Sequence, residues 1–310
     1  MTTNERARKR EEDGLKHLLD CEEGAVVASV DSVAGALGLK RPRATDMLAG
    51  LASKGLAKPR GDGWALTAEG RREALEVVRK HRLVETWLAR KTSVPAEAWH
   101  RAAHVAEHQL GTIETDELAN RLGNPRFDPH GDPIPTREGV LPPARRISLA
   151  EWPEGRDALI EHMEDEPETV FRDMVRAGLH PGMVVSGIAR LTDGGMELTG
   201  EGRTVKLPPA WLGMVHVTEV DAGEQPDSEV KRLSDLPVGS VSVVQGLSPA
   251  CVGAERTRLL DLGLVPGTEM RCEFTSPFQW PRAYFIRGTM IALRHEQAGR
   301  ILVKPKGGAA

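Results

Sequence analysis

The spacing of hydrophobic residues predicts helices over most of the N-terminal part of the chain. A run from Asp13 to Leu19 places its leucines on one face of a helix. Shorter apolar patterns predict two more helices, over 31–37 and 42–54. Asp31 is the predicted N-cap of the first, and Pro42 suits the first turn of the second. The pattern is therefore that of three helices, of which the last two form a helix-turn-helix.

After residue 54 the spacing of the apolar residues changes from helical to alternating. Two short strands are predicted over 56–60 and 64–67, joined by the turn Gly61-Asp62-Gly63. A hairpin after a helix-turn-helix is a wing, so residues 1–77 are predicted to form a winged helix-turn-helix domain.

Basic residues gather where such a domain meets DNA. A recognition helix contacts bases and phosphates through its first turns. The residues predicted to do so are Lys40, Arg41, Arg43 and Thr45 on the helix, with Lys58 and Arg60 on the wing. Winged helices also serve as protein-interaction modules, and that alternative stays open beside DNA binding.

The charge balance supports an anionic partner for one end of the chain. Residues 1–91 hold 18 lysines and arginines against 14 acidic residues, whereas the remainder holds 23 against 31. A basic segment joined to an acidic one fits a chain that holds an anionic partner at one end.

The rest of the composition is that of an ordinary globular chain. Of its 310 residues 40% are hydrophobic, but no apolar run is long enough for a membrane-spanning helix. The charged N-terminus is followed by no apolar stretch, so no secretory signal is expected. Its 3 cysteines form no C-x-x-C pair, which favours a reducing cytoplasm and gives no support to a cysteine-based metal site.

Side chains that can bind metal form a ladder in the next part of the chain. In the predicted long helix over 68–90, His81 and Glu85 are four residues apart. Beyond it, His100, His104, Glu107 and His108 follow the spacing i, i+4, i+7 and i+8, which places them on one face of a helix. Imidazole and carboxylate groups without thiolate suit Mn, Fe, Co or Zn. A solvated polar face is the alternative interpretation.

An internal repeat occupies the C-terminal half. Gly178-Leu-His-Pro-Gly182 returns as Gly263-Leu-Val-Pro-Gly267. In both copies a short helix precedes this turn and alternating apolar strands follow it, which predicts two small five-stranded β-barrels. Stretches 136–147 and 221–229 are predicted linkers. The fold class expected is multidomain α+β.

Several of these motifs together resemble the diphtheria-toxin-repressor family of metal-dependent repressors. They are the winged helix, Arg79-Lys-His-Arg-Leu-Val-Glu85, Ala103-His-Val-Ala-Glu-His108 and the proline-rich Pro129–Pro135 segment, within residues 11–140. In that segment, His130 is either a turn residue or a further ligand. Both C-terminal copies look like the SH3-like FeoA domain that often ends such repressors. The second, with Arg258–Gly267, is the clearer one, and the presence of two copies departs from the family pattern.

The resemblance implies two metal sites. The family's main site would map onto Asp13, His104, Glu107 and His108, and its ancillary site onto His81, Glu85 and His100. Glu166 and Glu168 would complete the ancillary site from the first SH3-like domain, although Glu164 is equal to them in charge. Asp13 favours the manganese-responsive branch, His104 matches neither branch, and Lys16 stands where manganese sites use a carboxylate. Mn²⁺ or Fe²⁺ is therefore the expected cofactor, and Zn²⁺ or Co²⁺ should also bind in vitro.

The function that the resemblance implies is that of a metal-activated repressor which binds double-stranded operator DNA as a homodimer. The predicted domains are a winged helix (1–77), a metal-binding and dimerisation domain (78–142) and two SH3-like domains (143–222 and 230–310). We expect no membrane association, small-molecule substrate or enzymatic activity. A purely structural metal is one alternative, and partner binding by the repeats is another. A metallohydrolase is disfavoured because Arg101 stands where a zinc-protease motif has its general base.

Overall fold

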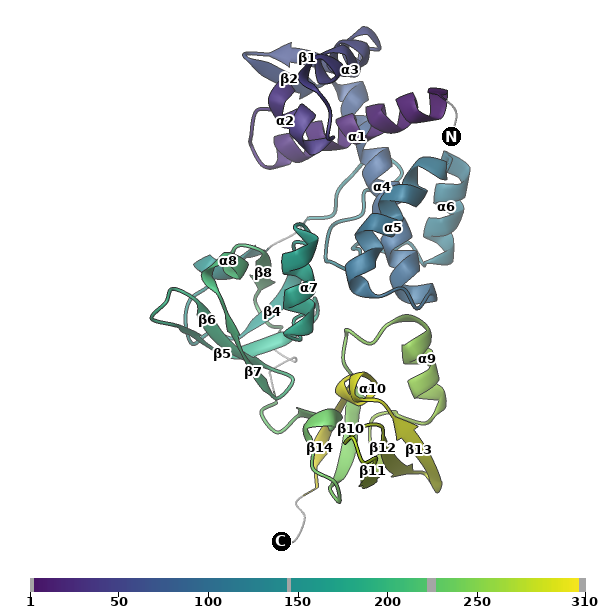
Figure 1. The fold of residues 1–310 in the computed structure, drawn as a ribbon, viewed down its shortest axis with the longest axis vertical. Coiled ribbons are helices and arrows are strands. Elements are labelled where there is room, and N and C mark those ends of the chain that lie inside the picture. Colours follow the sequence, from purple (N-terminus) through teal and green to yellow (C-terminus); the bar gives the residue numbers. More distant parts are fainter. Residues whose placement is uncertain (1–2, 144–145, 222–226, 307–310) are drawn as a thin grey trace. The chain divides into compact units, whose positions relative to one another are not determined.

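The computed structural model describes residues 3–143, 146–221 and 227–306. They divide into two compact units. The first unit holds the chain up to Trp87 together with His100–Asp128 and Pro133–Pro143, and the second holds Leu88–Trp99, Pro129–Asp132 and the chain after Pro143. Figure 1 shows the order of the elements along the chain. The predicted linkers 136–147 and 221–229 lie partly outside the described residues.

The first unit begins with a winged helix-turn-helix. It consists of α1 (Thr3–Glu23), α2 (Val30–Ala36), α3 (Arg41–Ser53), β1 (Ala57–Arg60) and β2 (Gly63–Leu66). The two strands pair antiparallel and form the wing. Leucines from α1 and α3 fill its core, namely Leu15, Leu18, Leu19, Leu48 and Leu51, each at most 2% exposed.

Two details of this domain differ from the sequence prediction. Helix α1 starts at Thr3, ten residues before Asp13, because its early turns are charged and have no apolar period to mark them. Ser29, and not Asp31, is the N-cap of α2: the Ser29 hydroxyl accepts a hydrogen bond from the Ser32 amide, and the Ser32 hydroxyl accepts one from the Ser29 amide. This reciprocal pair is a capping box, which fixes the start of the helix.

Helices that carry the metal-capable ladder follow the wing. They are α4 (Ala68–Lys91), α5 (Trp99–Ala106) and α6 (Thr112–Arg121), with 3₁₀ turns at Ala96–Ala98 and Glu107–Gln109. The single continuous helix expected around His100–His108 was thus wrong in its last turn. A 3₁₀ turn is tighter than an α-helix and is common at helix ends, so it changes the direction in which Glu107 and His108 point.

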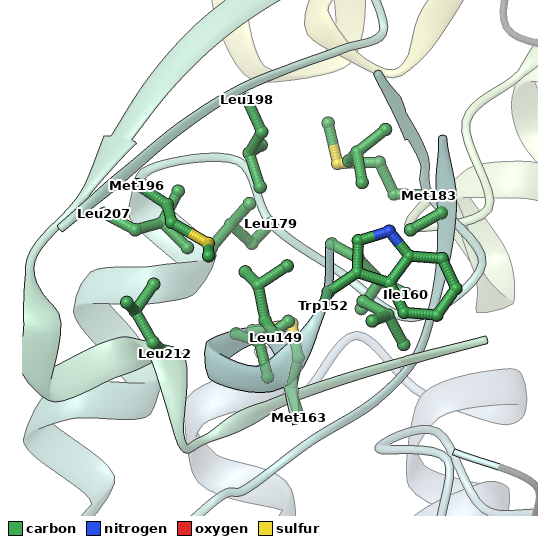
Figure 2. Packing of buried hydrophobic residues seen from close by; sticks show 14 of the residues in the cluster. Leu149, Trp152, Ile160, Met163, Leu179, Met183, Met196, Leu198, Leu207 and Leu212 are labelled. Atoms are coloured by element: carbon green, nitrogen blue, oxygen red, sulfur yellow. The ribbon is translucent and has the colours of Figure 1, made fainter. Parts of the chain in front are cut away.

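The second unit contains two β-rich domains of the same topology. The first consists of β3 (Ile147–Ser148), β4 (Ala158–Met163), α7 (Glu168–Arg176), β5 (Val184–Arg190), β6 (Met196–Gly200), β7 (Arg203–Leu207), α8 (Pro209–Leu212) and β8 (Val215–Thr218). Its antiparallel sheet has the order β3-β8-β4-β5-β6-β7. Leu149, Trp152 and Ile160 are among the residues of its core, packed with leucines and methionines from several strands (Figure 2).

The second β-rich domain repeats this plan. It consists of β9 (Lys231–Arg232), β10 (Val241–Leu247), α9 (Gly253–Asp261), β11 (Glu269–Thr275), β12 (Arg282–Ile286), β13 (Thr289–Leu293), α10 (His295–Gly299) and β14 (Ile301–Pro305). Read from β9, its sheet has the order β9-β14-β10-β11-β12-β13, so each strand has a counterpart in the first copy. The internal repeat is confirmed. Among the described residues, the sheet of each β-rich domain has six strands and not the predicted five, because the first strand of each copy is two residues long and shows no alternation.

Candidate metal centre

Four predicted ligands from three elements form a first cluster in the first unit. Asp13 comes from α1, His104 from α5, and Glu107 and His108 from the 3₁₀ turn after α5. The Asp13 Oδ1 atom lies 3.1 Å from Nε2 of His108, and that nitrogen lies 3.3 Å from Oε1 of Glu107. His104 is more peripheral: its Nδ1 is 3.1 Å from Glu107 Oε1 and its Nε2 is 3.9 Å from Asp13 Oδ1.

The central atoms of this first cluster are suitable ligands for a cation. Asp13 Oδ1, Glu107 Oε1 and His108 Nε2 are all buried, and none makes a hydrogen bond within the described part of the chain. Two carboxylate oxygens and a ring nitrogen at such distances are costly in a buried place unless a positive charge, from a proton or from a metal ion, lies between them. Two imidazoles and two carboxylates are a fitting donor set for Mn, Fe or Zn.

Glu12 contacts a residue of the first cluster and is not among the residues that the sequence predicts for it. His108 Nδ1 donates a hydrogen bond to Oε2 of Glu12, which leaves His108 Nε2 directed at the cluster. Arg8 in turn contacts Glu12, with its Nε 3.3 Å from Glu12 Oε1. A carboxylate on the far nitrogen of a ligating histidine fixes its tautomer and orientation. The signal was present, because Glu12 stands next to Asp13, but only the fold shows which of the acidic neighbours reaches His108.

A proton on His108 offsets the negative charges of the first cluster when no metal is bound. Burial lowers the pKa of His108, but the carboxylates of Asp13 and Glu12 beside its two ring nitrogens, together with the charge of Glu107, outweigh it and raise the pKa to about 9. Burial likewise raises the pKa of Glu107, yet the nearby imidazoles of His104 and His81 and the charge of Lys16 hold it well below its usual range. An imidazolium at His108 thus supplies the positive charge that a metal would replace, and a metal must displace that proton.

His81, Glu85 and His100 form a second cluster beside the first. His81 and Glu85 come from α4 and His100 from α5. His81 Nε2 lies 3.0 Å from Glu85 Oε1 and 3.3 Å from His100 Nδ1, and Glu85 Oε1 is 3.6 Å from the same His100 nitrogen. His81 therefore makes hydrogen-bond contacts with both Glu85 and His100, so more of the polar atoms of the second cluster have partners than in the first.

Glu107 connects the two clusters. Its Oε1 faces His104 and His108, while its Oε2 contacts Nδ1 of His81. Its side chain is fully buried. One carboxylate therefore belongs to the first cluster and also orients a histidine of the second. A change of charge in one cluster should therefore alter the electrostatic environment of the other.

Glu166 and Glu168 lie in the first β-rich domain, between β4 and the start of α7. Their assignment to the ancillary site stays a prediction. Glu164 belongs to a different group, with His162 and His216. His130 is buried in the second unit, where its ring packs edge-on to Phe171 with 5.1 Å between centroids.

The predicted DNA-contacting residues are all exposed. They are Lys40, Arg41, Arg43, Thr45, Lys58 and Arg60. Arg41 forms an ion pair with Asp31, and the Thr45 hydroxyl donates to the Arg41 carbonyl oxygen at 3.0 Å. Both side chains of the Arg41–Asp31 pair are about two-thirds exposed (66% and 68%), so this contact is easily exchanged for another anion.

Large apolar side chains are exposed on the helices that follow the wing. Ile113 is 74% exposed, Val105 57% and Trp87 42%. Each of these side chains therefore leaves apolar surface exposed on those helices. No helix among the described residues is long and apolar enough to cross a membrane.

Two family models match the chain. Residues 67–136 match the iron dependent repressor, metal binding and dimerisation domain, and residues 231–305 match the FeoA domain. The first match contains both clusters except for Asp13, and the second covers the second β-rich domain.

Relatives of known role are similar over most of their own length. The iron-dependent repressor IdeR of Mycobacterium bovis is 29% identical over 221 residues, which are 66% of this chain and 95% of the relative. The diphtheria toxin repressor of Corynebacterium jeikeium is 27% identical over 179 residues, which are 50% of this chain and 74% of the relative.

Solved structures of metal-dependent repressors are also similar to this chain. A manganese-dependent transcriptional repressor in complex with manganese superposes with a TM-score of 0.61 at 25% identity, covering 67% of this chain and 99% of that one. IdeR of T. acidophilum superposes with a TM-score of 0.56 at 27% identity, covering 67% and 97%. About a third of this chain therefore lies outside each match.

Proposed function

Since this chain belongs to the diphtheria-toxin-repressor family of metal-dependent regulators, we propose that it is a transcriptional repressor that binds operator DNA when a divalent cation is bound. The observation that carries the proposal is the first cluster, in which three buried atoms from α1 and the turn after α5 converge without hydrogen bonds among the described residues. Mn²⁺ or Fe²⁺ is the proposed physiological ion, with Zn²⁺ or Co²⁺ as substitutes in vitro.

The first cluster joins the winged helix to the helices that follow it. Asp13 lies on α1, whose leucines Leu15, Leu18 and Leu19 are part of the winged-helix core. Asp13, His104, Glu107 and His108 would hold the ion, with Glu12 orienting His108. When bound, the cation would supply positive charge in place of the proton on His108. Asp13 would then hold α1 close to His108 and so set the position of the winged helix.

Through this arrangement, metal binding and DNA binding would be thermodynamically linked. If the position of α1 that satisfies Asp13 and His108 is also the one that fits operator DNA, metal favours the DNA-binding state, and DNA must tighten metal binding by the same factor. Such couplings are typically about 1–3 kcal/mol, or roughly 5- to 150-fold in affinity. The second cluster would act through Glu107, which contacts both groups of donors.

The exposed basic residues of α3 and the wing would contact the DNA. Lys40, Arg41 and Arg43 lie at the start of α3, from which a recognition helix reads the major groove. Phosphate contacts of this kind make affinity fall steeply as salt rises. The exposed Val105, Ile113 and Trp87 would provide the apolar contacts of a homodimer, which would present two recognition helices to successive half-sites.

Fluorescence anisotropy of the full chain on the DNA upstream of its own gene tests the proposal. Mn²⁺ or anaerobic Fe²⁺ should produce binding, and a chelator should reverse it. Arg43→Ala should weaken DNA binding while leaving metal affinity without DNA unchanged. Binding that is indifferent to metal would instead mean a structural metal, and no binding in any condition would overturn the repressor. The absence of enzymatic activity stays a prediction.

A further inference from the structure

Two histidines of the first β-rich domain stand directly opposite each other on paired strands. His162 of β4 pairs with His216 of β8, next to the pair Met163 and Val215. A β-bulge shifts the register between Ile160 and His162. Ile160 and Met163 are both fully buried in the core, so the extra residue turns His162 to the other face of the sheet.

Glu164 completes a group of three on that face. It lies two residues after His162, and alternation along an extended chain gives the two the same direction. Oε1 of Glu164 is 3.1 Å from Nε2 of His162 and 3.9 Å from Nδ1 of His216. One ligand atom from each of the three residues lies within 4.8 Å of the others.

The ring nitrogens of this group lack ordinary partners. Both nitrogens of His162 and Nδ1 of His216 are buried, and none makes a hydrogen bond within the described residues. Buried imidazole nitrogens are normally satisfied by a hydrogen bond or a metal ion. The two rings lie with 5.2 Å between their centroids, close enough for one ion to reach both.

The carboxylate of Asp132 lies near Nδ1 of His162, the ring nitrogen that does not face Glu164. Oδ1 of Asp132 is 3.5 Å from His162 Nδ1, and Arg146 holds Asp132 through its Nη2 at 3.2 Å. Arg146 also donates from Nη1 to the Gly131 carbonyl oxygen at 2.7 Å, which fixes the segment that covers His162. A carboxylate behind a histidine, with the other nitrogen directed at a second donor, is the support that metal-binding histidines commonly have.

The second β-rich domain shows that the fold does not require these donors. It has the same strand pair, β10 and β14, with a register shift at the same place, between Val244 and Gly246. There the pair that corresponds to His162 and His216 is Gly246 and Leu302. Two histidines at this position are therefore a property of the first copy alone and not of the β-rich fold.

We propose that His162, Glu164 and His216 form a third metal site, in the first β-rich domain, for a late first-row divalent cation such as Zn²⁺ or Co²⁺. Two imidazoles and one carboxylate favour such ions over Mg²⁺ or Ca²⁺. The side chain of Glu164 is 49% exposed and that of His216 is 23% exposed, so solvent has access and water would complete the coordination. The site would fill independently of the two clusters of the first unit.

Metal counting on the full chain tests this site. The metal-free protein is equilibrated with buffered free Zn²⁺, and bound zinc per chain is measured for wild type, His216→Ala, Glu164→Gln and the control His295→Ala. His295 is an exposed histidine of the second β-rich domain that packs on Trp280. We expect both site variants to lose one zinc ion per chain at a free concentration that saturates wild type, whereas His295→Ala should retain all of them.

The expected loss of affinity at this site exceeds the roughly 10- to 100-fold that removing an outer partner costs, because a direct ligand is removed. If His216→Ala fails to fold, Glu164→Gln decides, since the residue is exposed and glutamine keeps its size. Equal zinc content and affinity in Glu164→Gln and wild type would overturn the proposal. Because the readout is bound metal, it stays interpretable whether or not the protein represses transcription.

Discussion

The two clusters of the first unit use the same kinds of side chain but differ in how far the protein itself satisfies them. In the second cluster His81 makes hydrogen-bond contacts with Glu85 and His100. In the first, Asp13, Glu107 and His108 each direct a buried atom that makes no hydrogen bond to another described residue. Metal should therefore change the first cluster more than the second.

The difference follows from where the donors come from. His81, Glu85 and His100 lie on α4 and α5, within one group of packed helices. Asp13 lies on α1, the first helix of the winged helix, and meets His108 across a separation of 95 positions in the sequence. A site built from two substructures can report their relative position, whereas a site within one substructure mainly stabilises it.

Glu107→Gln should have the largest effect, because that carboxylate serves both clusters. The amide cannot offer an anionic oxygen to His104 and His108 and also a carboxylate to His81. We expect Mn²⁺ affinity to fall by more than about 100-fold at the first cluster, and by roughly 10-fold or more at the second, where it is only an outer partner. Competition with a fluorescent chelator measures both.

Glu117→Gln is the matched control for this variant. Glu117 is exposed on α6 and pairs only loosely with Arg121, at 3.6 Å, so its loss should leave both affinities unchanged. If Glu107→Gln weakened one site alone, the connection between the clusters would be refuted.

Glu12→Gln should have an intermediate effect that is confined to the first cluster. It removes the acceptor that orients His108 and leaves every direct ligand in place. The expected loss is roughly 10- to 100-fold in metal affinity. Isothermal titration with Mn²⁺ measures it, with Glu11→Gln as the control, since Glu11 pairs with Lys54 at 2.6 Å. Equal losses in both variants would mean a general effect of charge on α1.

A buried carboxylate of the second unit, Glu201, has hydrogen-bond partners within the protein and so needs no metal ion. Glu201 of the first β-rich domain accepts hydrogen bonds from Ser248 at 2.7 Å and Arg232 at 3.0 Å, and lies 3.1 Å from His180 Nε2. Burial raises the pKa of Glu201, but hydrogen bonding to His180 and Ser248 and the charges of His180 and Arg232 lower it to about 2.

Glu201→Gln should have no effect on metal content but should lower the stability of the protein. A carboxyl whose pKa is depressed by folding contributes stability above its unfolded pKa of 4.5, and loses it as pH falls toward about 2. Urea unfolding should show the variant less stable by about 3 kcal/mol near neutral pH, with the difference shrinking below pH 4.5. A pH-independent difference would contradict this assignment.

The sequence was sufficient for features with local periodicity and insufficient for those made by distant pairing. Helical spacing predicted the winged helix and the ladder of His81 to His108, and the repeated glycine–proline turns predicted two copies of one domain. The His162–His216 pair was not predictable, because its members are 54 positions apart in the sequence and only the register of β4 and β8 joins them. The contact between Glu12 and His108 joins residues 96 positions apart, so the helical pattern does not mark it either.

Metal-stimulated operator binding by Asp13→Asn and His100→Ala, measured side by side, tests the central claim most directly. Asp13 belongs to the cluster that joins α1 to the following helices, and His100 to the cluster within them. Asp13→Asn should abolish the stimulation by Mn²⁺, and His100→Ala should keep it with less than a roughly 10-fold rise in the Mn²⁺ concentration required, the low end of the range for supporting groups. The reverse order, or equal effects, would contradict the account.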